Sequence, residues 1–227
     1  MRQLLLDFTQ APAPTFENFV PGRNAEPLAA LRAALEERGR FPFPERAKSE
    51  ASPVLYLWGE TGSGKTHLLQ AFADGRDGAR FVRGEDYLGT ESGGVLVLDD
   101  VERLGEARQV ALFNAFNERA FALIVVSAHA APRDVALRRD LATRLATGFT
   151  YRLLPLTDEE KSQALAAHAR ARGFALSDDV AAYLLTHARR DMPSLIRALD
   201  ALDRYSLETG RPITVPLLKA ALQPELT

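Results

Sequence analysis

The chain has 227 residues, of which 46% are hydrophobic and 26% are charged, and its formal net charge is −2. These values are ordinary for a folded globular protein and exclude a wholly disordered chain. The near-neutral charge balance argues against a protein whose main task is to coat nucleic acid. The chain has no cysteine, which excludes disulfides, thiol catalysis and cysteine-ligated metals, and its four histidines are too scattered to suggest a dedicated metal site.

Signals for membranes and secretion are missing from the sequence. No apolar run approaches the ~20 residues that are needed to span a bilayer. The first residues, MRQLLLDFTQ, contain too short an apolar run for a secretory signal. We therefore expect a cytoplasmic protein with no membrane partner.

The predicted elements begin with a helix over residues 27–38, where Leu28, Leu31 and Leu35 share one helix face and Gly39 ends the pattern. An exposed loop rich in proline and charge follows at 41–53. Short apolar runs then alternate with helices, which predicts a parallel sheet with helices on its faces. The predicted strands are 54–58, 79–83, 95–100, 123–127 and 151–154, and the intervening helices include 65–73 and 108–121.

Only helices are predicted after residue 156. Thr157 and Glu160 form a capping box for a helix that ends at Gly173, and further helices are predicted from Ser177 to about residue 190, over 192–209 and from Thr214. The sequence therefore predicts three parts: an N-terminal segment at 1–11, a parallel α/β lobe at 12–155 and a small all-helical lobe at 156–227.

A glycine-rich turn between the first strand and its helix carries the most specific motif, G-x-x-x-x-G-K-[ST]. Its residues are Gly59, Glu60, Thr61, Gly62, Ser63, Gly64, Lys65 and Thr66. Backbone N–H groups and the helix N-terminus would surround the phosphates of ADP or ATP. Lys65 would reach the β- and γ-phosphates, and the Thr66 hydroxyl would ligate Mg²⁺. The alternative is an incidental glycine turn.

Two carboxylates end the third predicted strand. Asp99 stands where a P-loop protein places a second carboxylate directed at Mg²⁺. Asp100 follows it and could orient or deprotonate the attacking water, as a general base must. The alternative is that both residues begin a solvated loop. These residues predict nucleotide binding and leave open whether this chain hydrolyses the nucleotide.

The phosphate-binding loop, the strands LVLDD and LIVVS, the segment DLATRL at 140–145 and the helical lobe together resemble the AAA+ module of the DnaA-like family. The resemblance extends from Phe16 to the C-terminus. DnaA initiators continue into a DNA-binding domain, whereas this sequence ends at Thr227 and carries QLLLDF at residues 3–8, which is similar to the short motif that docks proteins on the DNA sliding clamp. The combination resembles the Hda branch of the family, the regulatory inactivators of DnaA, and makes residues 156–227 the lid.

The resemblance implies roles for the residues that match the family's motifs. Ser127 falls at the sensor-1 position, Arg144 at the arginine finger that acts in trans on a neighbouring subunit, and Arg190 at the lid arginine that reaches the nucleotide. Each has a plainer alternative. Ser127 could simply finish a strand, Arg144 could pair with Asp140 on the surface, and Arg190 could end a solvated helix.

The N-terminal motif implies a partner of its own. Gln3, Leu4, Leu6 and Phe8 would enter a preformed groove on the sliding clamp, unless this segment packs on its own domain. The function that the resemblance implies is regulation of chromosomal replication initiation. The protein would bind adenine nucleotide and the DNA-loaded clamp and would stimulate ATP hydrolysis by the DnaA initiator, which prevents re-initiation.

Two other functions remain open from the sequence. One is an autonomous oligomeric AAA+ ATPase, such as a helicase loader or a DnaA-like DNA remodeller, which would hydrolyse ATP itself and contact single-stranded DNA. The other is an adaptor whose nucleotide only stabilises the fold. In the leading interpretation, DNA is contacted only through the clamp, and a homo-oligomer is possible.

Overall fold

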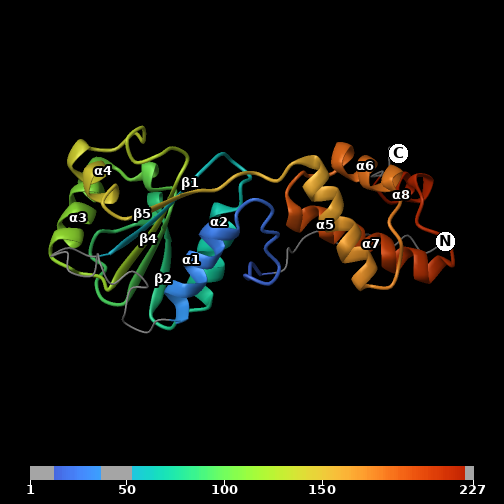
Figure 1. Ribbon diagram of the computed structural model, residues 1–227, viewed down its shortest axis with the longest axis horizontal. Coiled ribbons are helices and arrows are strands. Elements are labelled where there is room, and N and C mark those ends of the chain that lie inside the picture. Colours follow the sequence, from blue (N-terminus) through green and yellow to red (C-terminus); the bar gives the residue numbers. More distant parts are fainter. Residues whose placement is uncertain (1–12, 37–52, 223–227) are drawn as a thin grey trace. The chain divides into compact units, whose positions relative to one another are not determined.

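The computed structural model describes residues 13–36 and 53–222, which fall into two compact units. One unit is Pro14–Pro155, and the other holds all the helices from residue 156 onward. Figure 1 shows the first as a sheet with helices and the second as helices only. Among the described residues, no helix combines the length and the apolar character that a membrane span requires.

A single sheet of five parallel strands organises the first unit, in the order β2-β3-β4-β1-β5. The strands are β1 (Val54–Trp58), β2 (Ala79–Arg83), β3 (Val95–Asp99), β4 (Leu123–Ala128) and β5 (Phe149–Arg152). The central strands β1, β3 and β4 are buried along nearly all of their length, as expected when helices cover both faces of a parallel sheet. The predicted parallel α/β fold is confirmed.

Helices cover both faces of this sheet (Figure 1). Helices α1 (Ala25–Glu36) and α2 (Lys65–Asp74) pack on the face that carries Leu55 and its alternate neighbours. Helices α3 (Glu106–Asn117) and α4 (Arg139–Leu145) pack on the opposite face. Because the strands are parallel, their carboxyl ends meet at one edge, where the loops after β1, β3 and β4 come together.

The second unit is a four-helix lobe with its own apolar core. Its helices are α5 (Asp158–Ala171), α6 (Asp178–His187), α7 (Met192–Thr209) and α8 (Val215–Leu222). The predicted capping box is confirmed: the Thr157 hydroxyl accepts the Glu160 N–H at 3.2 Å, and the Glu160 carboxylate accepts the Thr157 N–H at 2.7 Å.

Several boundaries differ from the sequence-based expectation. Helix α3 ends at Asn117 rather than at 121, because Arg119 takes a left-handed conformation (φ 53°) that turns the chain toward the sheet. Strand β5 begins two residues earlier than predicted, and α6 stops at His187. Helix α4 was not predicted, since its seven residues are too few to show a clear helical repeat of apolar side chains.

Candidate functional site

The glycine-rich loop lies at the carboxyl end of β1, and at two of its positions a side chain would collide with neighbouring atoms. A Cβ at Gly59 would lie 2.1 Å from the carbonyl oxygen of Leu153, so no side chain fits there. Gly64 has φ +94°, and a Cβ on it would lie 2.7 Å from the ring of Phe19. The loop is therefore held tightly against its surroundings, with the N-terminus of α2 directly after it.

Lys65 is 5% exposed, and within the described part of the chain its ammonium group donates hydrogen bonds only to the loop itself. Nζ donates to the carbonyl oxygens of Gly59 at 2.7 Å and Glu60 at 3.0 Å. Burial lowers the pKa of Lys65, and the nearby carboxylates, Asp100 first among them, oppose that shift. The buried Ser63 hydroxyl has no hydrogen-bond partner among residues 13–36 and 53–222. A buried cation and a buried hydroxyl beside backbone amides suit the phosphates of a nucleotide.

A chain of hydrogen bonds joins the first turn of α2 to the ends of β3 and β4 around Asp99, which is 3% exposed. The Thr66 hydroxyl donates to Asp99 Oδ2 at 2.8 Å, and the Ser127 hydroxyl donates to Asp99 Oδ1 at 2.5 Å. The Ser127 oxygen also accepts the backbone N–H of Asp100 at 2.9 Å. The structure thus brings Thr66 and Asp99 together, as the prediction of a shared Mg²⁺ requires. Ser127 is fully buried and orients both aspartates.

Asp100 lies in a left-handed conformation (φ 54°) at the edge of this site. Its carboxylate is 3.5 Å from Arg103 Nε, which ties it to the short helical turn that follows β3. One carboxylate oxygen each of Asp100 and Glu102 and one ring nitrogen of His129 lie within 4.8 Å of one another. Glu102 Oε1 also accepts the backbone N–H of His129 at 3.0 Å. Sequence reasoning missed Glu102, although its position three residues after Asp99, in a tight turn, indicated that it would lie near Asp99 and Asp100.

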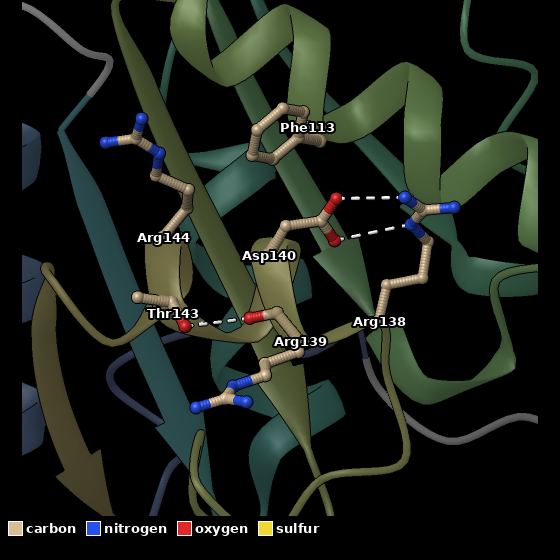
Figure 2. Close-up of a pocket in the computed structure, with 6 residues that line it drawn as sticks. All are labelled: Phe113, Arg138, Arg139, Asp140, Thr143 and Arg144. Carbon is tan, nitrogen blue, oxygen red and sulfur yellow. Dashed lines mark hydrogen bonds and ion pairs between the residues drawn. The ribbon is translucent and has the colours of Figure 1, made fainter.

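Arg144 lies in a different part of the first unit, on α4, and it is exposed. Its guanidinium carbon is 5.9 Å from the ring centre of Phe113 and 6.0 Å from that of Phe116. It borders an open pocket of about 620 Å³, whose lining includes Phe113, Arg138, Arg139, Asp140 and Thr143. Figure 2 shows Arg144 extending away from Asp140, whose carboxylate faces Arg138 instead. Among the described residues, no carboxylate pairs with Arg144.

Arg190 makes its contacts within the helical unit. Its Nη2 lies 2.6 Å from the Asp158 carboxylate at the start of α5, and this hydrogen bond lowers the pKa of Asp158. The neighbouring Arg189 pairs with Asp191 at 3.5 Å. A contact between Arg190 and a nucleotide stays a prediction. Gln3, Leu4, Leu6 and Phe8 lie outside the described residues, so the predicted clamp-docking segment stays a prediction too.

Comparisons with known proteins agree with this architecture. Residues 158–222 match the family model of the Hda lid domain. An uncharacterized protein of Haemophilus influenzae is 34% identical over 97% of this chain and 98% of its own length. Domain III of the replication initiation protein DnaA of Thermotoga maritima superposes with a TM-score of 0.65, at 23% identity, over 94% of this chain and 98% of that domain.

AMPPCP-bound DnaA from Aquifex aeolicus also has a TM-score of 0.65, at 21% identity, over 87% of this chain and 66% of that one. At these identities, the two solved structures establish a shared fold. The lid match and the full-length relative add the sequence relationship. The chain belongs to the Hda/DnaA-like family of AAA+ proteins.

Proposed function

We propose that this protein regulates the initiation of chromosomal replication by stimulating ATP hydrolysis in a DnaA initiator. Its membership in the Hda/DnaA-like family supports this proposal, and so does its fold, which it shares with the replication initiation protein DnaA. The protein would bind adenine nucleotide at its own loop and contact the initiator through the α3–α4 side of its first unit. Conversion of initiator-bound ATP to ADP would then prevent re-initiation.

The protein's own nucleotide site would take ADP or ATP with Mg²⁺. Lys65 and the loop amides would bind the phosphates. The Thr66 hydroxyl and Asp99 Oδ2, which lie 2.8 Å apart, would hold the cation. The related DnaA of Aquifex aeolicus binds AMPPCP, which supports an adenine nucleotide here. Titration calorimetry with ADP and ATP, with and without Mg²⁺, tests this site. Affinity that survives in Lys65→Ala would contradict it.

Arg144 carries the proposal about the partner. Its guanidinium has no carboxylate partner among the residues that the structure describes and lies near two aromatic rings, so it is suited to meet negative charge on another molecule. Placed against the initiator's ATP, it would stabilise charge on the transferring phosphoryl group. In systems where such a finger is known, it accelerates hydrolysis by ~10³–10⁵.

Residues 3–8 would bring the protein to DNA through the sliding clamp. Gln3 begins the segment, and Leu4, Leu6 and Phe8 follow at every second position, so an extended peptide would place these three apolar side chains on one side, as filling a groove requires. Clamp affinity is measured by surface plasmon resonance for wild type, for Gln3→Ala with Leu4→Ala, and for Gln10→Ala as a control just outside the motif. Equal affinity of the double variant and the wild type would refute this docking mode.

A reconstituted hydrolysis assay tests the proposal as a whole. Initiator is loaded with labelled ATP and mixed with this protein and DNA-loaded clamp, and each component is omitted in turn. Arg144→Ala is expected to abolish the stimulation, whereas Arg133→Ala, another exposed arginine that does not line the pocket, is expected to keep it. Full stimulation by Arg144→Ala would refute the trans-acting role.

The assembled Thr66–Asp99–Ser127 cluster favours one alternative, an autonomous ATPase such as a helicase loader or a DNA remodeller. Such a protein would turn over ATP alone and would lose that activity in Asp99→Asn. The regulator depends on the initiator for most of the ATP consumed. Comparing turnover by this protein alone with turnover in the full mixture separates the two functions.

A further inference from the structure

Asp140 stands four residues before Arg144 on the same helix, which is the spacing at which an acid and a base on a helix surface attract each other most. Asp140 is also the only acid among the residues that line the pocket, next to three arginines. If it paired with Arg144, the guanidinium proposed to act on a partner would be neutralised within its own chain. The structure shows a different pairing.

Asp140 instead binds Arg138, the residue just before α4 (Figure 2). Arg138 Nε donates to Oδ1 at 3.3 Å and Nη2 donates to Oδ2 at 3.0 Å, so both carboxylate oxygens are engaged by one planar group. The hydrogen bond from Arg138 is the main reason that the pKa of Asp140 lies below its ordinary value. Oδ1 also accepts the backbone N–H of Leu141 at 2.8 Å.

The backbone of Arg138 is fixed from a second helix. Its N–H donates to Gln109 Oε1 at 2.8 Å, and the Gln109 amide nitrogen donates to the carbonyl of Leu104 at 2.9 Å. The backbone position of Arg138 is therefore fixed, and its side chain is directed toward Asp140 in the first turn of α4. Arg144, in contrast, is held near Phe113 and Phe116 and has no carboxylate partner in the described part of the chain.

We propose that Arg138 is a positioning residue: by occupying Asp140, it keeps Arg144 free to act on a partner's nucleotide. This inference rests on the proposed function, because it assigns Arg138 a role only if Arg144 acts in trans. Removing Arg138 would release Asp140 to pair with Arg144. Exposed pairs at this spacing are weak, so we expect stimulation to fall about two- to fourfold, well short of the loss in Arg144→Ala.

The experiment compares four variants in the initiator hydrolysis assay at low ionic strength, where exposed ion pairs are strongest. Arg138→Ala is expected to lower the stimulated rate. Asp140→Asn keeps an acceptor for the Leu141 N–H and cannot form the ion pair, so Arg138→Ala with Asp140→Asn is expected to restore the rate. Asp140→Asn alone and Arg144→Ala complete the set of variants. The fall in the stimulated rate caused by Arg138→Ala is expected to shrink at high salt.

A second readout does not depend on the partner. The NMR resonance of the Arg144 Nε–H group reports whether a carboxylate binds it, and it is expected to shift in Arg138→Ala and to return in the double variant. A rate in Arg138→Ala equal to wild type would overturn the inference. A reduced rate that Asp140→Asn does not restore would also overturn it, because that result indicates only a structural role. If Arg144→Ala itself keeps full stimulation, the proposed function fails, and the NMR shift still tests the pairing.

Discussion

The hydroxyl of Ser127 is predicted to hold the nucleotide site together, and Ser127→Ala removes it with little change in volume. The side chain is completely buried, donates to Asp99 Oδ1 at 2.5 Å and accepts the Asp100 N–H at 2.9 Å. Without it, one oxygen of the 3%-exposed Asp99 carboxylate and one backbone N–H lose their partners. A hydrogen bond to a charged group contributes about 1.5–3 kcal/mol, so we expect the free energy of unfolding to fall by about 2–3 kcal/mol.

Urea unfolding followed by tryptophan fluorescence measures this loss. Trp58 is the only tryptophan and ends β1, so it reports on the unit that contains Ser127. With a denaturant slope of about 2 kcal/mol per molar urea, the midpoint should fall by about 1–1.5 M while the slope stays unchanged. Affinity for Mg²⁺-ATP should fall with it, because Asp99 loses a fixed orientation. A midpoint within about 0.2 M of wild type would refute the reasoning.

Three further predictions concern stability and the nucleotide. The buried hydroxyl of Tyr87 has no hydrogen-bond partner among the described residues, so Tyr87→Phe should raise the unfolding free energy by up to about 1 kcal/mol. Burial raises the pKa of Tyr87 to about 12, so the folded protein keeps a proton that the unfolded chain loses near ~10. Wild-type stability should therefore fall as the pH rises from about 10 to about 12, and less so in Tyr87→Phe, as urea unfolding across that range will show. Thr157→Ala should lower the melting temperature of the helical unit through a loss of about 1 kcal/mol, whereas Ser177→Ala, whose side chain makes no cap hydrogen bond, should barely change it. Lys65→Ala should lose binding of ADP and ATP in calorimetry, and retained stimulation of the initiator by this variant would indicate that its own nucleotide is dispensable for the partner.

The strands and the glycine-rich loop could be predicted because each depends on local sequence. A strand buried on both faces, such as β1, reads as an unbroken apolar run, and the loop between β1 and α2 has a fixed spacing of glycines before Lys65. The capping box at Thr157 was likewise visible as a pair of residues three positions apart. In these elements, the residues that determine the structure are neighbours in the chain.

The rest of the site depends on contacts between distant segments. Glu102 approaches His129 only because β3 and β4 lie side by side in the sheet. The pairing of Asp140 with Arg138 rather than with Arg144 depends on Gln109 of α3, which fixes the start of α4. Helix spacing alone favours the other pair. Sequence patterns identified Asp140 and Arg144, whereas packing decided which charged residues meet.

The most direct measurement is single-turnover hydrolysis of initiator-bound ATP, in the presence of DNA-loaded clamp, by wild type and by Arg144→Lys. Lysine keeps the positive charge but lacks the planar fork of the guanidinium and its stacking on aromatic rings. A role in stabilising the phosphoryl group predicts that Arg144→Lys loses most of the rate while binding the clamp–initiator complex as wild type does. Equal rates for the two proteins would contradict the account.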